Sequence, residues 1–252
     1  MIPIQRKPLK ASTQKVLSKR HTSVTKLASG SPRIQERWEY FLRPGANRAA
    51  YDDVRKTLGA MFHDKCCYCE KVIAKDIEHF YPKTFYPQRM FVWDNMLRAC
   101  KDCNFEKHNA DPEDPLDAQG QRSLLDPTID RPEEYISWDL ATGLPIYVNH
   151  GSGIHRGKRT VEVCDLDNQK FNDMRRERAK FFLHLIKQAL KETPVEPDTR
   201  ELLDEFLDAG KPWLGVIRQI VRDPAQSARL KAVVRKLPHL ESRLTALRWT
   251  HP

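Results

Sequence analysis

The feature that most constrains this chain is a pair of C-x-x-C motifs. Cys66 and Cys69 form the first motif, and Cys100 and Cys103 form the second. Because two matched pairs of thiolates can close a tetrahedral site, the spacing predicts a zinc ion with four cysteine ligands. The alternative, thiols that merely fill a hydrophobic core, would leave two matched spacings unexplained. We expect the zinc to be structural, since four protein ligands leave no position for water or substrate.

The two remaining cysteines lie outside this pattern. Cys67 has the wrong spacing to join the four ligands and is expected to be free, and Cys164 stands alone. Clustered cysteines are typical of metal binding in a reducing compartment. The sequence also has no apolar stretch of the roughly 20 residues that span a membrane, and no apolar secretory signal. We therefore predict a cytoplasmic protein.

Charge restricts the possible partners of the chain. Its formal net charge is +9 and its pI is about 9.3, which favours nucleic acid or an anionic membrane over an acidic substrate. The first 30 residues contain seven Lys and Arg and no acidic residue. We interpret residues 1–33 as a basic N-terminal arm that contacts phosphates, with a solvated tail as the alternative.

Apolar spacing divides the rest of the chain. Residues 34–115 combine two lead-in helices, separated at Pro44 and Gly45, with the cysteine-rich core. Residues 116–159 form a turn-rich connector with a short hairpin that turns at Thr142 and Gly143. Residues 160–252 have apolar positions at helical spacing and predict a helical C-terminal region. The expected fold class is α+β and mostly α-helical.

Between the two cysteine motifs lie residues suited to metal-assisted hydrolysis of a phosphodiester. That reaction needs a base to activate water, hard oxygen ligands for Mg²⁺, and cations near the developing charge. His79 is a suitable base, and the oxygens of Glu78 and Asn104 are hard ligands. The alternative for His79 is a structural histidine in the core. Neighbours on an ideal strand face opposite sides, so Glu78 and His79 can serve one site only if the backbone bends.

These residues occur in the order of a known motif. Glu78-His79, Pro82, Asn95 and the C-N-x-x-K sequence ending at Lys107 resemble the HNH, or ββα-metal, nuclease motif. The resemblance implies a zinc-stabilised ββα-metal core, an endonuclease activity and a catalytic Mg²⁺ or Mn²⁺. Glu78 replaces the commoner Asp, and Asn104 replaces the commoner His.

Each role is carried over by position in the motif. Glu78 and Asn104 would bind the catalytic metal, His79 would be the base, and Asn95 would orient the hairpin. Lys107 fits a phosphate contact, and Lys83, in the I-E-H-F-Y-P-K stretch, is assigned the same role. His108, one helical turn after Asn104, is an alternative metal ligand.

A closer resemblance covers residues 34–190. The elements C-x-Y-C-E, I-E-H-F-x-P-K, L-L-D-P-T-I-D-R-P-E-E-Y and the stretch around Cys164 resemble the PtuB-type HNH effectors of Septu and retron-associated anti-phage systems. The resemblance implies an ABC or SMC-like ATPase partner of PtuA type. It also implies a defence role through cleavage of nucleic acid, with DNA favoured over RNA as the target.

Two other functions remain open from the sequence. A stand-alone HNH enzyme of restriction or homing type would use the C-terminal helices to recognise DNA. A non-catalytic zinc module that binds nucleic acid would keep the four cysteines and the basic surface, but would have no need for Glu78, His79 and Asn104.

Overall fold

The computed structural model describes residues 1–45, 47–72, 74–110, 122–148 and 155–248, with side chains in the third range as far as Lys107. Helices make up most of the described chain, which confirms the prediction of a mostly α-helical fold. They are α1 Ala11–Thr22, α2 Pro32–Leu42, α3 Arg48–Phe62, α4 Lys101–Ala110, α5 Arg156–Val163, α6 Gln169–Lys191, α7 Pro197–Phe206, α8 Leu214–Arg222, α9 Pro224–Lys236 and α10 Leu240–Arg248. Short 3-10 helices occur at Pro87–Arg89, Trp93–Asn95 and Pro132–Glu134.

Two small antiparallel sheets accompany the helices. Strand β1, Asp76–His79, pairs with β2, Met96–Ala99, so that Glu78 lies opposite Leu97 and His79 lies opposite Met96. Helix α4 follows β2 directly. The second sheet joins β3, Ile136–Trp138, to β4, Pro145–Tyr147, which confirms the predicted hairpin. Its turn contains Gly143 at φ +80°, a conformation that glycine adopts without strain.

The predicted lead-in helices are α2 and α3. Pro32 occupies the first turn of α2, where its missing N–H removes no helical hydrogen bond. After the break at Pro44 and Gly45, α3 continues to Phe62 and ends at His63, which adopts the left-handed conformation at φ 50°. Both helices bury apolar side chains in the core, including Trp38, Phe41, Val54 and Leu58. The helical spacing in the sequence therefore predicted both helices correctly.

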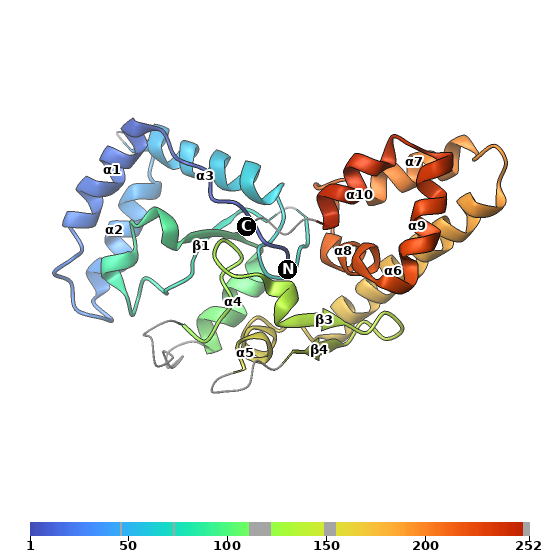
Figure 1. Ribbon diagram of the computed structural model, residues 1–252. Coiled ribbons are helices and arrows are strands. Elements are labelled where there is room, and N and C mark those ends of the chain that lie inside the picture. Colours follow the sequence, from blue (N-terminus) through green and yellow to red (C-terminus); the bar gives the residue numbers. More distant parts are fainter. Residues whose placement is uncertain (46, 73, 111–121, 149–154, 249–252) are drawn as a thin grey trace.

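The C-terminal region is helical, as predicted. The side chain of Asn168 caps α6 by accepting a hydrogen bond from the amide of Phe171, and Asp223 caps α9 by accepting from Ala225. Helices α7, α8 and α9 all contact the long helix α6. In Figure 1 they form a separate lobe on the right, while α1, α2 and α3 lie on the left and α4 and α5 lie between.

The N-terminal segment is folded onto the core. Leu9, Leu17 and Val24 are buried, and Arg6 donates hydrogen bonds to the carbonyls of Trp93 and Met96 beside β2. The alternative of a solvated tail was therefore wrong, because the apolar residues of the segment pack against the core. The composition of the segment alone does not predict this packing. The lysines of the segment remain exposed, so phosphate contact by this arm stays a prediction.

The C-terminal lobe packs directly on the loop that carries the first cysteine pair. The buried carboxylate of Glu70 accepts a hydrogen bond of 2.9 Å from the amide of Gly215. It also forms an ion pair with the Met1 ammonium, at 2.6 Å. A Cβ atom at Gly215 would lie 2.5 Å from Glu70 Oε1, so the close approach requires glycine. Lys65 adds a hydrogen bond to the carbonyl of Ala209.

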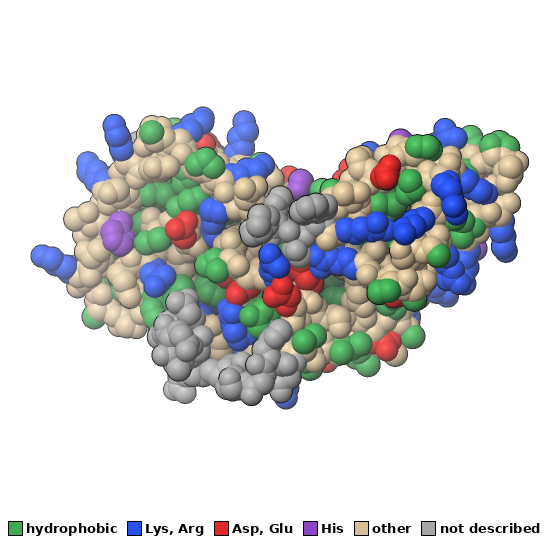
Figure 2. Space-filling view, in the orientation of Figure 1, with side chains coloured by type: hydrophobic (Ala, Val, Ile, Leu, Met, Phe, Trp, Pro, Cys, Tyr) green, Lys and Arg blue, Asp and Glu red, His purple; other side chains and the backbone are tan. Residues whose placement is uncertain are grey.

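Basic side chains remain on the surface of the C-terminal lobe. Helix α9 carries four exposed basic residues, Arg229, Lys231, Arg235 and Lys236. Figure 2 shows a row of Lys and Arg side chains over the right-hand lobe, where Figure 1 places α9 and α10. No described helix has both the length and the apolar character needed to cross a lipid bilayer.

Candidate metal centres and active site

The four predicted zinc ligands lie together. The ligand atoms of Cys66, Cys69, Cys100 and Cys103 are within 4.8 Å of one another, and all four side chains are buried. The Sγ atoms of Cys69 and Cys100 are 3.7 Å apart. This distance is close to the separation of about 3.8 Å between two sulfurs that are bound tetrahedrally to one zinc ion. The predicted clustering is confirmed, and the residues fit a zinc ion. Cys67 lies outside the cluster, as the spacing predicted.

Local backbone geometry brings the two cysteine pairs together. The first pair sits on a tight turn in which the amide of Glu70 donates to the carbonyl of Cys66, at 3.0 Å, and Glu70 adopts the left-handed conformation at φ 61°. Cys100 follows β2, and Cys103 lies in the first turn of α4. The β1–β2 hairpin and α4 are therefore attached to the cluster through the second pair.

The pKa values of the neighbouring cysteines Cys66 and Cys67 shift in opposite directions. Burial raises the pKa of Cys66, but hydrogen bonds from Cys100, Cys103 and the adjacent thiols outweigh burial, so the net pKa lies well below its usual value. Burial raises the pKa of Cys67 well above the usual value. The pKa values of Cys69 and Cys103 are raised as well, so it is the position of its sulfur, and not its pKa, that separates Cys67 from the cluster.

A cavity of about 260 Å³ lies beside this hairpin. Its walls come from α2, α3, β1, α4 and the chain after β1, and they include five predicted site residues, Glu78, His79, Lys83, Asn104 and Lys107. The structure therefore brings most of the predicted site to one cavity. The side chain of His108 lies outside the described residues.

Glu78 faces α4 from β1. Its carboxylate is buried and pairs with the ammonium of Lys107, with Oε1 and Nζ 2.7 Å apart. Lys107 Nζ also donates to the carbonyl of His79, at 3.1 Å, and the Lys107 side chain is only 2% exposed. Phosphate contact by Lys107 stays a prediction, but its ammonium is already held by two protein oxygens.

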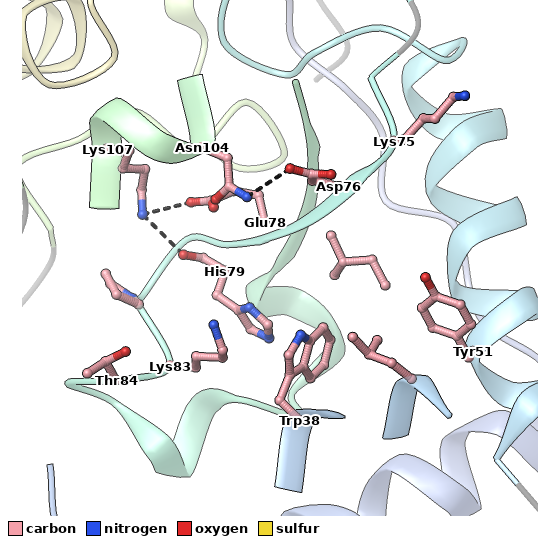
Figure 3. Close-up of a pocket in the computed structure, with 13 residues that line it drawn as sticks. Trp38, Tyr51, Lys75, Asp76, Glu78, His79, Lys83, Thr84, Asn104 and Lys107 are labelled. Carbon is pink, nitrogen blue, oxygen red and sulfur yellow. Dashed lines mark hydrogen bonds and ion pairs between the residues drawn. The ribbon is translucent and has the colours of Figure 1, made fainter. Parts of the chain in front are cut away.

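His79 lies at the end of β1, and its ring points to the other side of the strand from Glu78 (Figure 3). The ring packs edge-on against Trp38, with centroids 4.6 Å apart, and Nε2 lies 2.9 Å from the carbonyl oxygen of Met90. Because a carbonyl only accepts, Nε2 carries the proton. Nδ1 is then the basic nitrogen, and it has no hydrogen-bond partner among the described residues.

Burial keeps the His79 ring neutral. Together with the nearby positive charge of Lys83, burial lowers the pKa of His79 to about 3. Burial also lowers the pKa of Lys83, which lies half-buried in the same cavity, although the Glu78 carboxylate opposes this shift. A neutral imidazole with a free Nδ1 can accept a proton from a bound water.

Asn95 is buried and does not line the cavity. Its Oδ1 accepts from the amide of Tyr81, at 2.7 Å, and its Nδ2 donates to the carbonyls of Tyr81 and Arg89, both at 3.0 Å. These bonds tie the end of β1 to the segment that supplies the Met90 carbonyl. The orienting role of Asn95 stays a prediction.

Asp76 is a site residue that the sequence analysis missed. It lines the cavity two residues before Glu78, and its Oδ2 accepts a hydrogen bond from Asn104 Nδ2, at 3.2 Å. Figure 3 shows Asp76, Asn104, Glu78 and Lys107 along one side of β1. The available signal was the D-x-E alternation on a strand, which places two carboxylates on one face.

The donor set divides into two chemically different parts. Four thiols suit zinc, whereas the carboxylates of Asp76 and Glu78 and the amide oxygen of Asn104 suit a hard cation such as Mg²⁺ or Mn²⁺. The cavity also holds a neutral imidazole and the ammonium of Lys83. A base, hard oxygen donors and a cation therefore line one cavity, with the His79 ring on the other side of β1 from Glu78.

Comparison with known proteins gives two related matches, although no protein-family model matches the chain. The Septu protein PtuB of Bacillus thuringiensis is 29% identical over 154 residues, which cover 59% of this chain and 53% of that protein. The Septu protein PtuB of Bacillus mycoides strain KBAB4 is 30% identical over 160 residues, with 52% of this chain and 53% of that protein covered. The chain spans about half the length of the curated relatives it matches. The resemblance to PtuB-type Septu proteins that the sequence predicted is thereby confirmed.

Proposed function

We propose that the chain is a metal-dependent HNH endonuclease that hydrolyses phosphodiester bonds of nucleic acid. The observation that carries this proposal is that Glu78, His79 and Asn104 all line one cavity on the hairpin attached to the four-cysteine cluster. The order of elements, two antiparallel strands followed by α4, is the order expected of a ββα-metal core. The +9 net charge suits a polyanionic substrate.

His79 is the proposed base. Its Nε2–H is held by the Met90 carbonyl, which leaves Nδ1 to take a proton from the attacking water. The lowered pKa leaves the ring neutral at pH 7, and it also makes Nδ1 a weaker base than a free imidazole. Asn95 supports this arrangement by holding the loop on which Met90 lies.

Glu78 and Asn104 are the proposed ligands of the catalytic cation. When bound there, Mg²⁺ or Mn²⁺ supplies charge that stabilises the phosphorane-like transition state and the leaving oxygen. Lys83, half-buried on the cavity wall, is placed to bind a phosphate oxygen. Lys107 keeps the Glu78 carboxylate and the end of β1 in place through its two contacts.

The biological setting is proposed from the relatives. Both are named as Septu proteins, so we infer that this chain is the nuclease effector of an anti-phage system. It would then act with an ABC or SMC-like ATPase of PtuA type, on DNA rather than RNA. The test is co-purification with an ATPase of PtuA type, and a chain that stays alone and cuts specific DNA unaided would favour the restriction or homing alternative.

Substitution of the base tests the catalytic part of the proposal. His79→Ala should lower the cleavage rate by about 10²- to 10⁴-fold, the usual contribution of a positioned base, without loss of zinc. Cleavage of plasmid, single-stranded DNA and tRNA is measured in Mg²⁺ and in EDTA. His184→Ala, an exposed histidine on α6, is the matched control. Full activity of His79→Ala would remove this residue from the mechanism.

A non-catalytic zinc module that binds nucleic acid is the second candidate. It is favoured by the contact between Lys107 and Glu78, because an ammonium already neutralises one of the proposed metal ligands. The two functions are separated by the same assay combined with a binding measurement. Binding without cleavage, under conditions in which zinc is present and Mg²⁺ is in excess, would select the module.

A further inference from the structure

We propose that Asp76 is a second carboxylate of the catalytic cation site, acting together with Asn104. The inference rests on the proposed function, because it concerns the same site. Asp76 and Glu78 are separated by one residue on β1, and alternate residues of a strand share a face. Both line the cavity with Asn104.

The contact between Asp76 and Asn104 sets the direction of the amide. A carboxylate accepts hydrogen bonds and does not donate, so the Asn104 atom at 3.2 Å from Asp76 Oδ2 is the nitrogen Nδ2. The amide oxygen Oδ1 must then point away from Asp76. Figure 3 shows Asn104 between Asp76 and Glu78 on one side of β1. Asp76 therefore presents the amide oxygen to the space beside Glu78.

The charges of the cavity give Asp76 a second role. Glu78 is paired with Lys107 at 2.7 Å, and both side chains are buried, at 5% and 2% exposure, so their charges offset one another. Lys75 and Lys83 add two positive charges to the lining. Among the described lining residues, Asp76 carries the remaining carboxylate, and a divalent cation requires such anionic oxygen donors. Asp76 lowers the net positive charge of the lining and so reduces its repulsion of a cation.

Mn²⁺ binding to the zinc-loaded full chain tests this role independently of catalysis. The free Mn²⁺ signal in electron paramagnetic resonance gives the dissociation constant for the unmodified protein and for Asp76→Asn, Asp76→Glu and Glu78→Gln. Asp173→Asn is the matched control, because it removes the same charge from the exposed surface of α6. Zinc content is measured for each variant to establish that the hairpin is intact.

Asp76→Asn should raise the Mn²⁺ dissociation constant about 10- to 100-fold, the range found when partners of a metal ligand are removed. Asp76→Glu, which keeps the charge, should recover part of the affinity, and Asp173→Asn should bind as the unmodified protein does. If Asp76→Asn loses zinc, Asp76→Ser, whose hydroxyl can still accept from Asn104, replaces it in the comparison.

Two failures are distinguishable. If the unmodified protein binds Mn²⁺ no better than Glu78→Gln does, the cation site of the proposed function is wrong. If Glu78→Gln weakens binding while Asp76→Asn, with its zinc retained, binds as tightly as the unmodified protein, the role of Asp76 is wrong and its contact with Asn104 is only structural.

Discussion

The four-cysteine cluster and the oxygen-lined cavity lie on the same hairpin, but their donor atoms differ in kind and in arrangement. The cluster gathers four identical donors at matched spacings, all buried, on two short segments of chain. The cavity mixes carboxylates, an amide, an imidazole and lysines from several elements, and its charges partly cancel. A structural metal site can be closed and uniform, whereas a site that must admit substrate and exchange ligands needs mixed donors.

The largest effect should come from breaking the cluster. Cys100→Ser removes one thiolate, and since structural zinc supplies folding free energy on the order of 10 kcal/mol, we expect loss of zinc and unfolding of the hairpin with α4. Zinc content and far-ultraviolet circular dichroism measure this. Cys67→Ala, a buried cysteine outside the cluster, is the control and should keep its zinc. Equal zinc content in both variants would contradict the four-cysteine site.

A smaller effect should come from breaking the charge pair in the cavity. Glu78→Ala removes the carboxylate that pairs with the buried ammonium of Lys107. Removal of one partner of a buried ion pair lowers the free energy of unfolding by about 3–5 kcal/mol. Urea unfolding of the zinc-loaded protein measures it. Replacing Lys107 with Met in the same chain should restore part of the stability. The exposed pair of Lys71 and Asp102 is the control, and Lys71→Met should change stability by less than about 1 kcal/mol.

The smallest effect should come from the contact between the cluster loop and the C-terminal lobe. Gly215→Ala places a Cβ 2.5 Å from Glu70 Oε1 and 3.2 Å from the carbonyl of Met1, so we expect a loss of about 1–3 kcal/mol from overpacking. Thermal unfolding measures this, with zinc content unchanged. Gly210→Ala meets only the side chain of Asp208 and serves as the control. Equal stability of the two variants would mean that the lobe tolerates displacement from the loop.

The sequence predicted those features that depend on regular spacing. The helices α2, α3 and α6 follow apolar positions at helical intervals, and the four cysteines follow two equal spacings. The partners of individual polar side chains were less accessible. The contact of Lys107 with Glu78 was not predicted, and Asp76 was overlooked although it contacts Asn104. Each partner lies far along the chain, and no local pattern records the pairing.

Local periodicity and cysteine spacing therefore predicted the mostly helical fold class and the four-cysteine cluster, and the quoted sequence motifs carried the resemblance to PtuB-type proteins. Tertiary structure alone decided that the N-terminal segment packs on the core, that Asp76 contacts Asn104, and that His79 is held by the Met90 carbonyl. The physical reason is that the backbone geometry of one helix, strand or turn converts the spacing of residues in the sequence into positions of side chains in space. Burial and hydrogen bonding, by contrast, depend on which elements come together in three dimensions.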